Sequence, residues 1–140
     1  RAAEGGHGPA YVVREYAAVL RTPWARVVLG VSFLEGALVF GAFAFFAAHL
    51  HQALGVSLAT AGVLVMPFAL GGLVFALSTR TLLGRLGELG LVRGGGASML
   101  VATTIVAFVP GAAFAAVACF LMGLGFYMLH NTVQTNATQM

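Results

Sequence analysis

The acidic residue Glu35 lies inside an otherwise uncharged apolar stretch, residues 27–48. An ionised side chain near the centre of a bilayer costs about 3 kcal/mol or more, so a carboxylate placed there usually has a function. Desolvation favours the neutral form of a carboxyl group, which lets it take up and release protons. Glu35 shares a broad helical face with Ser32, and both are candidates for proton coupling or for binding a cationic substrate. The alternative is a structural acid that pairs with a polar group on a helix outside this sequence.

A second group of polar residues follows a glycine-rich apolar run near the end of the chain: Tyr127, His130, Asn131, Gln134 and Thr135. Tyr127, Asn131 and then Gln134 or Thr135 are spaced by three or four residues and therefore share one helical face. Tyr127, His130 and Asn131 are candidates for lining the inner end of a substrate path. The alternative is a helix that simply emerges into the cytoplasm, and we favour it for the residues beyond Gln134.

The remaining reactive side chains do not form a catalytic or metal-binding pattern. His49 and His51 are two residues apart, so they do not share a helical face, and no Cys, Asp or Glu lies near them to complete a metal site. The single cysteine, Cys119, lies in an apolar run and offers neither a disulfide nor a metal ligand set. No nucleophile–base pattern stands out. We therefore expect no enzyme activity, no cofactor and no metal.

The composition is that of an integral membrane protein. Hydrophobic residues make up 60% of the chain and charged residues only 8%, and the mean hydropathy is +0.97. A soluble domain normally carries about a quarter charged residues. All basic residues are arginines at scattered positions outside the apolar runs, without a basic stripe. We therefore expect the lipid bilayer, and no nucleic acid, as a partner.

Four apolar stretches predict four transmembrane helices. Residues 27–48 and 58–79 each match the roughly 20 residues that a helix needs to cross the hydrocarbon core. A longer run is divided by the turn signal Pro110-Gly111 into helices at about 94–109 and 112–131. Pro67 is expected to bend the second helix. The predicted fold class is thus an all-α membrane protein with four transmembrane helices.

The arginines predict the orientation of these helices. They occur before the first span and around the link between the second and third: Arg14, Arg21, Arg26, Arg80, Arg85 and Arg93. The two links on the other side contain no Arg or Lys. By the positive-inside rule the arginine-bearing links are cytoplasmic, and Trp24 occupies the place of an interfacial anchor.

The segment before the first span, residues 10–23, is compatible with an amphipathic helix that Pro23 ends. It predicts a cytoplasmic surface helix, with a plain linker as the alternative. The chain starts at Arg1 and stops within a polar pattern, so we expect it to be a piece of a longer protein.

This pattern resembles the major facilitator superfamily of transporters. REYAAVLRTPWARVVL (14–29) is similar to the end of the central cytoplasmic linker entering the seventh of twelve helices, and GLGFYMLHNTVQTNATQM (123–140) is similar to the tenth helix. More narrowly, the chain looks like the second half of a bacterial drug or sugar efflux permease driven by protons. The resemblance implies a linker at 1–23 and part of the C-terminal transmembrane bundle of a twelve-helix protein at 24–140.

The same resemblance implies a function and partners. It implies proton-coupled efflux of a small organic molecule or drug by alternating access, from a multi-pass position in the bacterial inner membrane. The partners would be the small-molecule substrate, protons, the lipid bilayer and the missing helices of the same chain. In RTLLGRLGELG (80–90), Arg85 and Gly87 match the family's cytoplasmic loop signature, whereas Gly84 stands where the family has Asp. The loss of that acid removes the usual charge contact with a neighbouring helix end.

Two other functions fit the residues. One is a self-contained four-helix multidrug exporter that acts as a dimer, like the small multidrug resistance proteins, which also carry a Glu in their first helix. The other is a non-transporting membrane assembly subunit, in which Glu35 would pair with a partner protein.

Overall fold

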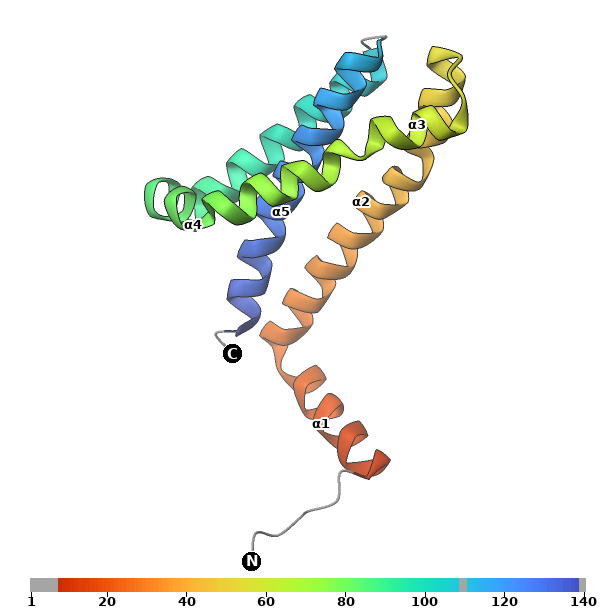
Figure 1. Ribbon diagram of the computed structural model, residues 1–140. Coiled ribbons are helices and arrows are strands. Elements are labelled where there is room, and N and C mark those ends of the chain that lie inside the picture. The colour runs from red at the N-terminus through yellow and green to blue at the C-terminus, as the bar shows by residue number, and fades with distance from the viewer. Residues whose placement is uncertain (1–7, 109–110, 139–140) are drawn as a thin grey trace, which may run out of the picture.

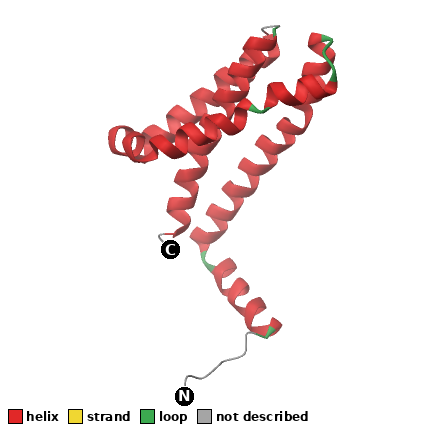
Figure 2. Cartoon of the chain, viewed as in Figure 1, coloured by secondary structure: helices red, strands yellow, loops and turns green. Residues whose placement is uncertain are grey.

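The computed structural model describes residues 8–108 and 111–138, and the regular elements in these ranges are all helices (Figure 2). They are α1 (Pro9–Arg21), α2 (Pro23–Leu54), α3 (Leu58–Val65), α4 (Pro67–Phe108) and α5 (Ala112–Thr138). The predicted all-α class is confirmed. Three helical stretches of the described chain are long and apolar enough to span a membrane: Pro23–Leu54, Leu58–Phe108 and Ala112–Ala137.

Helix α2 contains the predicted first span and holds Glu35 in its central third. Pro23 occupies the first turn, where the N–H that proline lacks has no helical partner to lose. Gly55 ends the helix in the left-handed conformation, with φ of 65°. The 32 residues of α2 extend about 48 Å at 1.5 Å per residue, which exceeds the roughly 30 Å of a bilayer core. Glu35 is therefore far from both ends of the helix.

The helical chain is interrupted between α3 and α4. The Ser57 side chain caps α3 by accepting a hydrogen bond from the Thr60 N–H at 3.1 Å. At the other end, α3 stops at Val65 and α4 starts at Pro67. Proline has no N–H to continue the hydrogen-bond ladder of the preceding turn. The predicted bend at Pro67 is confirmed.

Helix α4 reverses its direction at Gly87 (Figure 1). Gly87 has φ of 66° and ψ of 177°, a conformation that is essentially restricted to glycine. We call residues 67–86 the first arm and residues 88–108 the second arm. Helical conformation continues past the predicted span limits 79 and 94 to both sides of Gly87. The link between these two helices is therefore much tighter than the sequence predicted.

Helix α5 packs against both arms of α4 at backbone distance. A Cβ added to Gly123 would lie 1.9 Å from the carbonyl oxygen of Phe68 in the first arm. On the second arm, the Ser98 hydroxyl donates a hydrogen bond to the Leu121 carbonyl at 2.8 Å. Small residues at such contacts let membrane helices approach closely and gain van der Waals packing. The α4–α5 unit is consequently the tightest part of the bundle.

The contacts along α5 also define the direction of each helix. In the first arm, residue numbers rise together with those of the α5 residues they contact, since Phe68 meets Gly123 and Gly72 meets Tyr127. In the second arm they fall as the α5 numbers rise, since Ser98 meets Leu121 and Gly95 meets Gly125. The residue numbers of α2 also fall as those of α5 rise, since Phe46 packs near Met122 and Glu35 contacts His130. Thus α5 runs parallel to the first arm and antiparallel to the second arm and to α2. The helices alternate in direction, as successive membrane crossings require.

The surface of the bundle is strongly apolar. A small core of Phe46, Ala102, Ala118, Cys119 and Met122 lies between α2, the second arm and α5. Many large apolar side chains point outward instead; Leu77 is 81% exposed and Phe108 is 79% exposed. Exposed apolar surface on this scale indicates contact with other protein or with membrane.

Candidate functional site: a buried carboxylate–histidine pair

The side chains of Glu35 and His130 contact each other between α2 and α5. The Nδ1 atom of His130 lies 3.0 Å from Oε2 of Glu35. The Glu35 side chain is only 9% exposed, and that of His130 is 34% exposed. Among the described residues, the polar partner of Glu35 is His130 of the same chain. The structure therefore brings together two residues that the sequence suggested separately.

The second ring nitrogen of His130 contacts Gln134. Nε2 of His130 lies 2.9 Å from Nε2 of Gln134, one turn further along α5. When the amide nitrogen of Gln134 faces the ring, it donates and His130 Nε2 accepts, so a neutral ring carries its proton on Nδ1 and donates it to the Glu35 carboxylate. This orientation of the Gln134 amide thus goes together with the tautomer that suits the pair.

Glu35 uses only one of its two carboxylate oxygens. Oε1 is buried and has no hydrogen-bond partner among the residues that the structure describes. A buried carboxylate oxygen without a donor is costly, because its hydration is lost without compensation. A proton on the carboxyl group, or a donor group that enters the site, would remove this cost.

Aromatic rings hold the pair in place. Phe126, one turn before His130 on α5, stacks on the imidazole with ring centroids 5.3 Å apart and an interplanar angle of 19°. Phe40 of α2 meets Phe126 edge-on at 5.5 Å. Phe126 is 5% exposed, so the ring beneath His130 is fixed by the core. Such packing holds the plane of the imidazole against the Phe126 ring.

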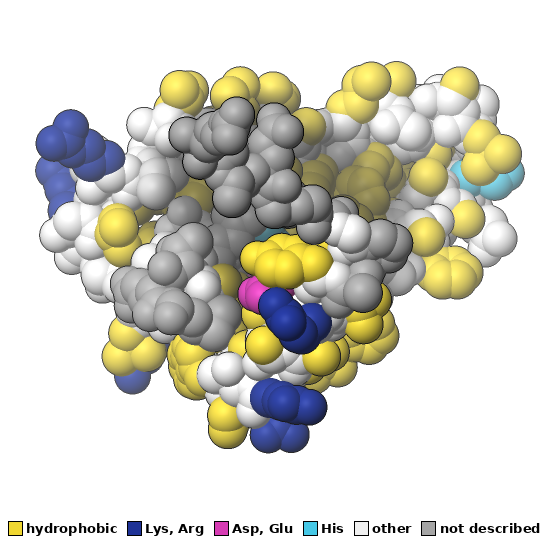
Figure 3. All heavy atoms as spheres, turned by 90° about the horizontal axis from the view of Figure 1, so that it is seen from below, with side chains coloured by type: hydrophobic (Ala, Val, Ile, Leu, Met, Phe, Trp, Pro, Cys, Tyr) yellow, Lys and Arg dark blue, Asp and Glu magenta, His cyan; other side chains and the backbone are white. Residues whose placement is uncertain are grey.

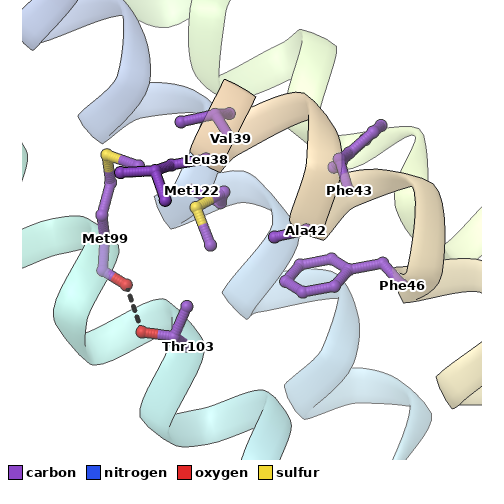
Figure 4. Close-up of a pocket in the computed structure, with 8 residues that line it drawn as sticks. All are labelled: Leu38, Val39, Ala42, Phe43, Phe46, Met99, Thr103 and Met122. Atoms are coloured by element: carbon purple, nitrogen blue, oxygen red, sulfur yellow. Dashed lines mark hydrogen bonds between the residues drawn. The ribbon is translucent and has the colours of Figure 1, made fainter. Parts of the chain in front are cut away.

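Two apolar cavities lie along α2 on either side of Glu35. The first, of about 180 Å³, is lined by Leu38, Val39, Ala42, Phe43, Phe46, Met99, Thr103 and Met122 (Figure 4). The second, of about 290 Å³, is lined by Trp24, Val27, Val28, Val31, Val92, Leu129, Thr132, Val133 and Asn136. Val31 and Leu38 lie one turn before and one turn after Glu35. The carboxylate therefore stands between the two cavities along the helix.

The other residues of the predicted substrate path lie apart from these cavities. Tyr127 is 40% exposed and its ring packs on Gly72 of the first arm. Asn131 accepts a hydrogen bond from Thr135 through its backbone carbonyl. Neither residue lines the first or the second cavity. Ser32 is half-buried on α2, one turn before Gly36. Of the predicted path, the structure brings only His130 into contact with Glu35.

The sequence predicted His130 as a candidate, but it did not single out Phe126, which stacks on the ring, or Gln134, which contacts it. Phe126, His130 and Gln134 recur at four-residue spacing and form the stripe of α5 that faces Glu35. The stripe was visible in the sequence, but Tyr127 and Asn131 define an equally regular stripe on another face. Thr132 and Asn136, in the wall of the second cavity, were not distinguished from the polar end of the helix.

His49 and His51, near the end of α2, contact backbone carbonyls. His49 Nε2 lies 3.4 Å from the Val106 carbonyl oxygen, and His51 Nδ1 contacts the Val56 carbonyl. In the described ranges no three residues among His, Cys, Asp and Glu gather into a possible metal site. Arg85 is exposed on the last turn before Gly87, and Gly87 itself makes the reversal of α4.

Comparison with known families gives one match. A family model described as Major Facilitator Superfamily matches residues 2–140. No curated protein and no solved structure matches the chain significantly.

Proposed function

Because this chain belongs to the Major Facilitator Superfamily, whose members are multi-pass membrane transporters, we propose that it is part of a secondary transporter. In this proposal the transporter exports a small organic molecule by proton-coupled alternating access. The main support for this proposal is the part-buried Glu35–His130 contact, which is 3.0 Å long and lies between two apolar helices. Intramembrane ionisable residues that pair with one another are typical of proton relays in transporters.

The pair can hold one exchangeable proton. With a neutral imidazole that donates through Nδ1, the pair carries a charge of −1 on the Glu35 carboxylate. Addition of a proton, to the carboxyl group or to the ring, brings the net charge to zero. The loss of a buried negative charge changes the cost of closing apolar helices around it, and so biases one conformation over the other. This is the differential interaction that coupling requires.

The cavities support the choice of substrate class. Their walls are almost entirely aliphatic and aromatic, with isolated polar groups such as Thr103 in the first and Asn136 in the second. Sites of this composition suit small, mainly apolar organic molecules. Glu35 lies along α2 between the residues of that helix that line the two cavities.

The wider setting is part of the same proposal. We take residues 1–23 as a cytoplasmic linker and residues 24–140 as part of the C-terminal bundle of a twelve-helix transporter in a bacterial inner membrane. The outward apolar surface of α2 and α4 would then contact lipid and the remaining helices of the same chain. The family match favours this proposal over a non-transporting assembly subunit and over a small dimeric exporter.

The test is Glu35→Gln in the full-length protein, reconstituted in vesicles with an imposed proton gradient. Proton-driven accumulation of the transported compound should be lost, while exchange of labelled for unlabelled compound without a gradient should persist. Glu88→Gln is the matched control, because Glu88 is exposed beside Gly87. Undiminished uphill transport by Glu35→Gln would exclude Glu35 as the coupling residue.

A further inference from the structure

Helix α1 has two chemically distinct faces. At 100° per residue, one face gathers the apolar side chains Val12, Val13, Tyr16, Val19 and Leu20. Val13 is 67%, Tyr16 68% and Leu20 53% exposed, so the bundle does not cover this face. The opposite face carries Arg14 and Ala18, with Glu15 and Arg21 toward its edges. Such a helix is built to lie at a boundary between an apolar and an aqueous phase.

The position of α1 fixes where that boundary is. Only Thr22 separates α1 from Pro23, the first residue of α2. Thr22 is extended, with φ of −74° and ψ of 118°, and α1 turns away from the axis of α2 (Figure 1). Since α2 spans the membrane, α1 begins at the membrane surface. Trp24, 49% exposed in the first turn of α2, is a residue type enriched at that interface.

The charges around α1 indicate which lipids it meets. Arg14 and Arg21 lie on α1 and Arg26 lies one turn into α2; all three are exposed, and Glu15 is the one acid on α1. Seen from below, the molecule shows one acidic side chain with an arginine side chain against it, and further arginine side chains toward the lower and left edges (Figure 3). Arg14 also stands over the Tyr11 ring, with its Cζ atom 5.8 Å from the ring centroid. Guanidinium groups bind phosphate oxygens well.

We propose that α1 docks on the membrane itself: its apolar face lies in the boundary between headgroups and acyl chains, and Arg14 and Arg21 bind the phosphates of anionic lipids. The occupant of this face is thus an anionic lipid surface, and not a protein segment. The inference stands on α1 and its junction with α2 and does not depend on the Glu35–His130 pair.

The experiment is a spin-label scan of the full-length protein in a Cys119→Ala background. Labels are placed by Val13→Cys, Tyr16→Cys and Leu20→Cys on the apolar face, and by Ala18→Cys on the opposite face as the matched control. The protein is reconstituted either in vesicles of phosphatidylglycerol with phosphatidylcholine or in phosphatidylcholine alone. Collisions with oxygen, which dissolves in lipid, and with a water-soluble nickel chelate report the depth of each label.

In anionic vesicles, the three apolar-face labels should collide with oxygen and be shielded from nickel, whereas the label at position 18 should show the reverse. Arg14→Gln and Arg21→Gln should each lower the ratio of docked to undocked helix roughly five-fold. That is the effect expected when one basic side chain no longer attracts an anionic membrane surface. Equal nickel access on both faces would overturn docking. Shielding of position 13 from both reagents would show a protein cover and overturn the lipid assignment. Equal docking in the anionic vesicles and in the vesicles of phosphatidylcholine alone would overturn the role of the arginines.

Discussion

Gly95 and Gly125 face each other backbone to backbone across the contact between the second arm of α4 and α5. A Cβ on Gly95 would lie 2.7 Å from the carbonyl oxygen of Gly125, and a Cβ on Gly125 would lie 2.6 Å from the carbonyl oxygen of Gly95. The contact is thus reciprocal, and the nearest atom in each case is a backbone oxygen, which cannot move aside as a flexible side chain can. One turn away, Ser98 adds its hydrogen bond to the Leu121 carbonyl. These contacts position α5, and with it His130, relative to α4.

Gly95→Ala should therefore destabilise the bundle by about 1–3 kcal/mol, the usual cost of overpacking a close contact. Gly96→Ala is the matched control, because a Cβ at Gly96 meets nothing within 4 Å. At that open position alanine's better helix propensity should leave stability unchanged or raise it by up to about 1 kcal/mol. Thermal unfolding of the full-length protein in detergent measures both. Equal transition temperatures for the two variants would contradict the close contact.

The reversal at Gly87 gives a second pair of substitutions. A Cβ at Gly87 has open space around it, so any penalty for Gly87→Ala arises from its backbone angles of 66° and 177° alone. Conformations of this kind cost of order 1–3 kcal/mol for residues other than glycine. Gly84→Ala, three residues earlier in helical backbone and equally open, should be neutral or stabilising.

The measurement for this pair is again thermal stability, combined with protease sensitivity of the 80–93 segment in sealed vesicles. Gly87→Ala should lower stability and increase cleavage, whereas Gly84→Ala should change neither. A neutral Gly87→Ala would mean that the chain can reverse at another residue.

The helices were predictable from the sequence because their causes are local. A run of uncharged residues long enough to cross a bilayer is a property of consecutive residues, and so is the missing N–H of Pro67. The residue at which α4 reverses its direction was harder to predict from the sequence. Glycines occur at 84, 87 and 90, and nothing in the local sequence distinguishes Gly87, which takes the non-helical angles, from the other two.

The site was predictable residue by residue, but its assembly was not. Glu35 was identified because a carboxylate in an apolar span is costly, and His130 because it belongs to a polar run. Their pairing joins positions 95 residues apart, and it depends on how α5 is rotated against α2. That rotation turns the stripe of Phe126, His130 and Gln134 toward Glu35, and it turns Tyr127 toward Gly72 instead.

A double-mutant cycle measures the strength of the Glu35–His130 contact. His130→Leu should destabilise the protein, because it leaves the buried carboxylate without a donor; in a Glu35→Gln background the same change should cost less. Coupling energies of contacting residues lie between about 0.5 and 3 kcal/mol. We expect about 1 kcal/mol or more here, since the Glu35 side chain is only 9% exposed. Additive effects on thermal stability would indicate that the two side chains do not interact.

The tautomer of His130 is the last prediction, and it concerns Gln134. Because Nε2 of His130 accepts from the Gln134 amide at 2.9 Å, the neutral ring should carry its proton on Nδ1. The ¹⁵N shifts of labelled histidine in reconstituted protein report this directly, and the signal that disappears in His130→Asn identifies residue 130. Gln134→Leu should release Nε2 and populate the Nε2–H tautomer, whose Nδ1 can accept from a protonated Glu35 but cannot donate to the carboxylate. Gln134 is exposed, so this variant should change stability by less than about 0.5 kcal/mol. An Nε2–H ring in the unaltered protein would contradict the direction of the hydrogen bond to Glu35. In that case the proton would have to sit on the carboxyl group.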